Sequence, residues 1–185
     1  MKLSILLVAA LSIVSVSNAQ KFFTKTGKIS FDATAPKSPE NIDGVNKNSI
    51  CVIDTKTGDI QFSVLMKGFE FERALMMEHF NENYVESDKF NKTTFKGTIT
   101  NNESINYSKD GVYPAKVKGK LDMHGQSKDL ETEGKIIVKA GKVEVSANFI
   151  AQFDDFKIVI PQLVADKVAK FAKIVVDCTL DPLAK

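Results

Sequence analysis

The chain has 185 residues, with 25 Lys or Arg against 23 Asp or Glu, for a formal net charge of +2. This near balance argues against a nucleic-acid-binding domain, which carries a strong basic surplus, and the lysines alternate along the chain instead of clustering. Hydrophobic residues make up 43% of the chain, which is enough for a packed core in a single domain.

The N-terminus has the pattern of a secretory signal peptide. One basic residue, Lys2, is followed by an apolar run over residues 3–16 and by small residues that permit cleavage after Ala19. The run is shorter than the roughly 20 residues that a membrane span needs, and no later segment is apolar enough to cross a bilayer. We therefore expect residues 1–19 to be removed and residues 20–185 to form one exported domain, periplasmic or secreted, without stable membrane insertion.

Most of the remaining chain alternates apolar and polar residues with a period of two, which is typical of half-buried β-strands. Val117 and Leu121, for example, share one face with small residues, while lysines occupy the other face. The pattern predicts strands within residues 28–34, 49–68 (two strands around a turn at 55–58), 93–101, 114–125, 128–138, 142–153, 156–160 and 173–180. About eight or nine strands with regular turns indicate an all-β domain, either a sandwich or an up-and-down barrel.

Two segments depart from this alternation. Leu75, Met76 and Phe80 recur at helical spacing within residues 72–83. After Pro161, a residue tolerated at a helix start, apolar residues recur at steps of four and three through residues 162–173. We expect short helices or long connections here, placed over an end of the β domain.

Several residues on the predicted inward face are small, namely Ala33, Gly97, Ala115, Gly119, Gly134 and Ala147. Glycine within a strand marks a bend or a close approach. The interior of an eight-stranded barrel is either just filled by side chains or holds one small ligand. The small residues therefore indicate either a ligand cavity or two closely packed sheets, and spacing alone does not choose between them.

The two cysteines, Cys51 and Cys178, both lie in predicted strands. Export would permit a disulfide between them. Both positions also suit buried free thiols, because a bridge requires Cα atoms within about 4.4–6.8 Å of each other. The sequence leaves both states open.

The sequence lacks the motifs of common enzymes. Its two histidines are His79 and His124, and it contains no G-x-S-x-G elbow, P-loop or Gly-rich dinucleotide motif. Methionines near both histidines are compatible with copper. However, Met76 belongs to the helical apolar stripe and Met123 to an inward strand face, where methionine commonly fills space. We therefore predict no enzymatic activity, cofactor or metal, and a metal site at His79 or His124 is the less favoured alternative.

Two motifs resemble the YceI-like family of exported, lipocalin-like proteins. The first is "FERALMMEHFNENYVESDKFNKTTFKGTI", in which an acidic segment containing Leu and Met precedes an aromatic residue and a strand of the type "yPkttFkG". The second, "GKLDMHGQSKDL" at residues 119–130, matches G-x-L-x-hydrophobic-H-G-x-[ST]-K. Asn91 replaces the usual proline of the first motif, and Asp122 replaces the usual small polar residue of the second.

The resemblance implies a single antiparallel eight-stranded lipocalin-like barrel with one or two short helices at its ends. Its interior would hold a long-chain lipid such as a polyisoprenoid, for transport or storage, and residues 74–90 would lie at the barrel mouth. Combined with the inward strand faces, it predicts ligand contacts from Phe31, Phe62, Val64, Met66, Leu75, Met76, Phe80, Phe95, Gly97, Val117, Gly119, Leu121, Phe149 and Phe156. In this interpretation Gly97 and Gly119 are small because the hydrocarbon chain passes them.

The chain contains 13 phenylalanines, which could line a cavity or fill it. A structural or stress-related barrel without a ligand is therefore the main alternative function. A homodimer is retained as a candidate assembly.

Overall fold

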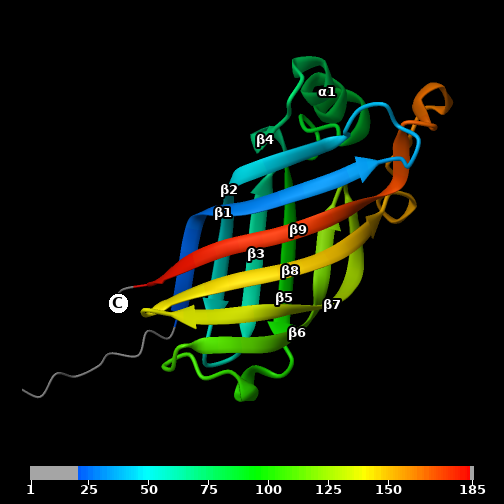
Figure 1. Ribbon diagram of the computed structural model, residues 1–185. Coiled ribbons are helices and arrows are strands. Elements are labelled where there is room, and N and C mark those ends of the chain that lie inside the picture. The colour runs from blue at the N-terminus through cyan, green and yellow to red at the C-terminus, as the bar shows by residue number, and fades with distance from the viewer. Residues whose placement is uncertain (1–20, 184–185) are drawn as a thin grey trace, which may run out of the picture.

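Eight long antiparallel strands wrap into a barrel in the computed structural model, which describes residues 21–183 (Figure 1). The predicted signal peptide, residues 1–19, lies outside the described residues. The long strands are β1 (Lys21–Thr34), β2 (Asp43–Asp54), β3 (Asp59–Leu65), β5 (Lys92–Ile99), β6 (Gly111–Met123), β7 (Gln126–Lys139), β8 (Lys142–Gln152) and β9 (Val168–Pro182). Short helical segments are η1 (Met66–Gly68), α1 (Ala74–His79), η2 (Phe80–Tyr84), η3 (Asn102–Ser104), η4 (Asp154–Phe156) and η5 (Gln162–Val164).

The barrel closes through the pairing of β1 with β2. The strands follow the order β1-β9-β8-β7-β6-β5-β3-β2, and β1 then pairs with β2 from Lys21↔Asp54 to Asp32↔Asp43. The two-residue strand β4 (Phe69–Glu70) pairs with β2 beyond the end of β3. The predicted eight-stranded barrel is confirmed, and the sandwich alternative is wrong.

Tight turns set the register of the hairpins. Met123 pairs with Gln126, so the β6–β7 loop consists of His124 and Gly125, with φ angles of +50° and +70°. Two consecutive residues with positive φ form the turn whose twist matches that of the flanking strands. Ala140 and Gly141 connect β7 to β8 in the same way, with φ angles of +50° and +76°.

One end of the barrel is filled by side chains. Ile53, Ile99, Ile136 and Leu180 are almost completely buried there. The β5–β6 connection, at the bottom of Figure 1, closes this end, and its Tyr107 ring stacks on Phe22 with a centroid distance of 6.4 Å. A barrel filled on this side leaves any open interior space at the opposite end, where α1 lies.

Both cysteines contribute to the filled end as free thiols. Burial raises the pKa of Cys178 to about 12, with a further contribution from the charge of Asp177. Burial also raises the pKa of Cys51 well above its usual value. The two side chains therefore act as small apolar residues of the core.

The two predicted helical segments have different outcomes. The first forms α1 and continues as the π-helical turn η2, in which the Val85 amide donates to the Phe80 carbonyl. The second segment begins as expected with a short helix, η5, and a connection, but β9 starts at Val168, so the helical interpretation of the spacing beyond that residue is wrong. Residues four apart share a face in a strand as well as in a helix, and here Val168 pairs with Thr34 of β1. The predicted strand over 156–160 is also absent, since η4 and an irregular connection occupy it.

None of the helices within residues 21–183 has the length and apolar character needed to cross a membrane.

Candidate ligand-binding cavity

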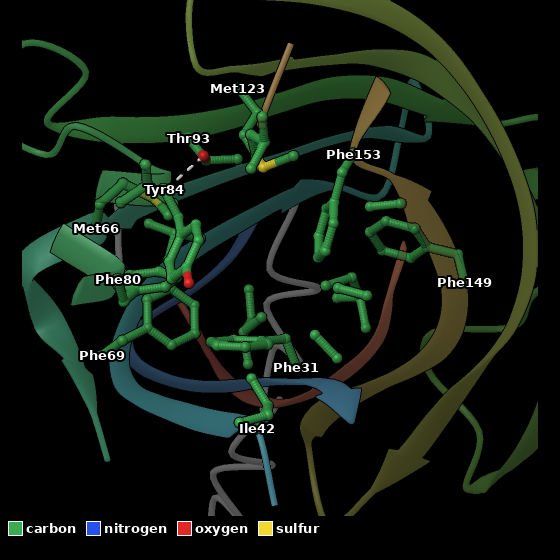
Figure 2. Close-up of a pocket in the computed structure, with 18 of the residues that line it drawn as sticks. Phe31, Ile42, Met66, Phe69, Phe80, Tyr84, Thr93, Met123, Phe149 and Phe153 are labelled. Atoms are coloured by element: carbon green, nitrogen blue, oxygen red, sulfur yellow. Dashed lines mark hydrogen bonds between the residues drawn. The ribbon is translucent and has the colours of Figure 1, made fainter. Parts of the chain in front are cut away.

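The half of the barrel next to α1 is hollow and encloses a cavity of about 420 Å³ (Figure 2). This volume falls within the roughly 300–1,000 Å³ of ordinary small-molecule sites. Inward side chains of every long strand except β2 line it, together with residues of η1, β4, α1, η2 and the β8–β9 connection. Its inner walls are formed mainly by aliphatic and aromatic side chains, which suits an apolar ligand.

Aromatic residues hold the α1–η2 segment against the barrel. The Phe80 ring stacks on Phe31 at a centroid distance of 5.3 Å and an interplanar angle of 12°. It also contacts Phe69 at 5.4 Å and Phe71 at 5.0 Å. Helix α1 itself contains no buried residue, so its position depends on this cluster. Each such aromatic pair contributes about 0.5–1.5 kcal/mol beyond area burial.

Charged residues occur at the mouth of the cavity. Arg73, at the start of α1, forms an ion pair with Glu40 of the β1–β2 connection, and both residues line the opening. His79 and Lys167 also line it. The rim carries an exposed apolar side chain as well, since Leu75 is 60% exposed. The mouth is therefore amphipathic, whereas the interior is apolar.

His124 connects Glu86, just after η2, with η4 in the β8–β9 connection. Its Nδ1 lies 2.8 Å from the carbonyl oxygen of Phe156, and its Nε2 lies 2.9 Å from a carboxylate oxygen of Glu86. The edge of the ring also packs against Phe90 at 4.5 Å between centroids. Both polar partners are acceptors, so making both hydrogen bonds together requires a proton on each ring nitrogen.

The backbone around this contact is unusual. Glu86, His124 and Lys157 have φ angles of +45°, +50° and +54°, in the left-handed region that non-glycine residues rarely adopt. The role of His124 as a link between the β6–β7 turn and the segments of Glu86 and Phe156 was not predicted. His124 does not line the cavity, whereas His79 does. Within residues 21–183, no group of three or more His, Cys, Asp or Glu side chains is placed to hold a metal ion.

Most of the predicted ligand contacts come together in the cavity wall. Those that line it are Phe31, Phe62, Val64, Met66, Leu75, Met76, Phe80, Phe95, Val117, Leu121 and Phe149. Gly97, Gly119 and Phe156 do not line it. Phe156 belongs to η4 and is buried where η4 packs against β7 and β8, outside the cavity.

The two glycines are small for a reason other than ligand passage. Gly97 pairs with Gly119, and a Cβ atom on Gly119 would lie 2.5 Å from the Cα of Gly97 and 2.6 Å from the Phe95 ring. Because neither glycine has a side chain, the Phe95 ring fits over them and the two strands can approach each other closely. The hypothesis that a hydrocarbon chain passes them is therefore corrected. Of the other small residues, Ala33 and Ala147 do line the cavity.

Other lining residues were not predicted. Phe153 continues the alternation of Ala147 and Phe149 in β8, so the sequence contained a signal for it. Phe69 and Tyr84 lie in β4 and η2, where neither period two nor the regular helical period applies. Their inward orientation could not be predicted from spacing.

The model of the family described as YceI-like domain matches residues 8–180 of the chain. Among solved structures, the chain is similar to a polyisoprenoid binding domain from Saccharophagus degradans implicated in plant cell wall breakdown, at 10% identity and a TM-score of 0.76, over 89% of this chain and 99% of that one. It is similar to Burkholderia cenocepacia BcnA at 12% identity and a TM-score of 0.65, over 83% and 95% of the two chains.

A third similar structure is the YCEI protein of Campylobacter jejuni, at 17% identity and a TM-score of 0.53, over 76% of this chain and 85% of that one. A comparison with curated protein sequences finds no match. At these identities the structural similarities establish the shared barrel fold. The family match, which covers most of the chain, shows that this protein belongs to the YceI-like domain family.

Proposed function

We propose that this protein is exported and that its barrel holds one long-chain apolar lipid, a polyisoprenoid or a similar molecule, for transport or storage. The observation that carries the proposal is the hollow half of the barrel, whose apolar wall leads to a mouth beside α1. The similar barrel from Saccharophagus degradans, described as a polyisoprenoid binding domain, supports the same class of ligand.

Burial of the hydrocarbon chain would supply the binding energy. Each methylene removed from water contributes about 0.8 kcal/mol, offset by the entropy lost when the chain is ordered. The filled end of the barrel, where Ile53 and Leu180 are buried, blocks passage through the molecule. The lipid would therefore enter tail first and keep its polar end near the mouth.

The alternative of a barrel without a ligand is less well supported. Phe31, Phe62, Phe80, Phe95 and Phe149 all line the cavity, so these rings do not fill it. An enzymatic function has less support still. The inner wall consists mainly of apolar side chains, and no hydrogen bond among residues 21–183 joins a nucleophile to a base at the cavity.

Mass spectrometry of organic extracts from the natively purified protein tests the proposal. We expect a long-chain lipid at close to one molecule per protein, and an N-terminus at Gln20 in protein recovered from the periplasm or medium. The variant Ala147→Phe places a ring in the cavity and should lower the lipid content while the barrel still folds.

The matched control is Ile150→Phe, on the same strand but 54% exposed on the outside. It should retain the lipid of the wild type. A wild-type protein that yields no lipid from its native host, and that binds no apolar probe after purification, would contradict the proposal.

A further inference from the structure

Tyr84 places a hydroxyl group inside the apolar cavity without a hydrogen-bond partner. The residue ends the π-helical turn η2 and lines the cavity. Figure 2 shows its hydroxyl pointing inward, toward the phenylalanine rings of the wall. Within residues 21–183, no side chain or backbone group forms a hydrogen bond with it.

The other two tyrosines of the described chain are satisfied. The Tyr107 hydroxyl donates to Asn102 Oδ1 at 2.8 Å, and the Tyr113 hydroxyl donates to the carbonyl oxygen of Lys109 at 2.9 Å. Tyrosine hydroxyls in the interior of proteins usually find a partner, because an unmade hydrogen bond costs free energy. Tyr84, which is half-buried, therefore departs from the pattern of the other two tyrosines.

The threonines of the cavity wall do have partners. Thr132 donates from Oγ1 to the carbonyl oxygen of Asn148 at 3.2 Å. The Thr93 hydroxyl donates to the sulfur of Met66 at 3.2 Å, as Figure 2 shows. Among the hydroxyl groups that line the cavity in the described part of the chain, that of Tyr84 is therefore the one without a hydrogen-bond partner.

We propose that Tyr84 donates a hydrogen bond to an uncharged oxygen atom of the bound lipid, so that the preferred ligand is an oxygenated long-chain lipid and not a bare hydrocarbon. The oxygen belongs to a hydroxyl, carbonyl, ether or ester group. This inference rests on the proposed lipid-binding function and specifies the chemistry of the ligand.

The surroundings of Tyr84 favour an uncharged group. Phe31, Phe69 and Phe80 form the adjacent wall, and a charged group placed among such rings would lose its hydration. The cations that line the cavity, Arg73 and Lys167, come from the segments that form its mouth. Burial raises the pKa of Tyr84, so its phenol stays protonated and able to donate at neutral pH.

The position of Tyr84 agrees with tail-first entry of the ligand. Its element η2 follows α1 directly, at the mouth end of the barrel. Phe95 and Val145 line the cavity from strands that continue into the filled end. A lipid whose tail reaches those residues would place its oxygenated end beside Tyr84.

The test compares farnesol with farnesene, which share an isoprenoid carbon skeleton; farnesene lacks the hydroxyl group and has one more double bond. Their affinities are measured by displacement of the uncharged fluorophore N-phenyl-1-naphthylamine from wild-type protein and from Tyr84→Phe. The variant removes one oxygen atom and keeps the ring. We expect it to weaken farnesol binding by roughly 2- to 12-fold, the range for one hydrogen bond, and to leave farnesene binding unchanged or slightly tighter.

The control variant is Tyr113→Phe, which deletes a hydroxyl that bonds Lys109 and does not line the cavity. It should leave the farnesol-to-farnesene affinity ratio at its wild-type value. If Tyr84→Phe lowers the melting temperature by more than a few degrees, Tyr84→Met replaces it, because methionine adapts to irregular apolar space.

The outcomes separate the inference from the function on which it rests. If neither probe binds the wild type, the lipid-binding proposal fails and the inference fails with it. If both probes bind and loss of the Tyr84 hydroxyl changes their affinities by the same factor, or changes neither, only the role of Tyr84 is overturned. A selective loss for farnesol supports it.

Discussion

Gly97 and Gly119 face each other across β5 and β6, and the ring of Phe95 lies over both of them. A Cβ atom on Gly119 would come within 2.4 Å of the Lys96 carbonyl oxygen and 2.5 Å of the Gly97 Cα atom. Both are backbone atoms, which cannot move aside as the end of a flexible side chain can. The close approach of two strands, and not a ligand, determines the residue type here.

We therefore expect Gly119→Ala to reduce the free energy of unfolding by about 1–3 kcal/mol or more, as overpacking does. Gly119→Leu should prevent a stable fold. Urea denaturation followed by circular dichroism measures both effects. The control is Gly111→Ala, whose Cβ would meet only the end of the Tyr113 side chain, 3.1 Å away. Equal stability losses at the two positions would show that backbone crowding is not the cause.

These glycines illustrate which parts of the structure could be predicted. Alternation identified the inward faces of most strands, because the buried side of a strand has a period of two. It could not reveal which atoms lie opposite an inward residue, since that depends on cross-strand register. Val168 shows a second limit, because a spacing of four fits a helix and a strand alike, and its pairing with Thr34 decides the outcome. Tyr84 lies in a π-helical turn, where no simple period applies.

The contacts of His124 predict that the two histidines differ in their effect on stability. His124→Asn removes a ring whose nitrogens bond the Phe156 carbonyl and the Glu86 carboxylate, while asparagine tolerates the left-handed backbone. We expect a loss of about 1–3 kcal/mol and faster amide hydrogen exchange around residues 85–90. His79→Asn, at the exposed mouth, should change stability by less than about 0.5 kcal/mol. A similar loss for both variants would contradict the role of His124 as a link.

The buried thiols predict a dependence of stability on alkaline pH. Burial raises the pKa of Cys178 from 9.0 to about 12, so the folded protein keeps this proton at pH values where the unfolded chain releases it. Stabilisation from the thiol is therefore complete below about pH 9 and is lost as the pH rises toward 12. Chemical denaturation between pH 7 and 11 should show this decline above pH 9.

A Cys178→Ala variant is the reference for this prediction, because it lacks the Cys178 thiol and keeps that of Cys51. Its stability should fall less steeply above pH 9 than that of the wild type. At pH 8 an aromatic disulfide reagent should react with the wild-type thiols only after unfolding, since both are buried. Rapid reaction in the native state would contradict the burial described here.

The ion pair between Arg73 and Glu40 connects α1 to the β1–β2 connection across the mouth of the cavity. Exposed ion pairs contribute about 0–1 kcal/mol, so Arg73→Ala should leave the melting temperature nearly unchanged. It should nevertheless speed the dissociation of a bound apolar fluorophore, by up to about fivefold, because 1 kcal/mol corresponds to that factor. High salt should speed dissociation from the wild type and have less effect on the variant. Lys118→Ala removes the comparable Lys118–Glu131 pair between β6 and β7, away from the mouth. An equal change in its dissociation rate would mean that the mouth pair has no specific influence on ligand exchange.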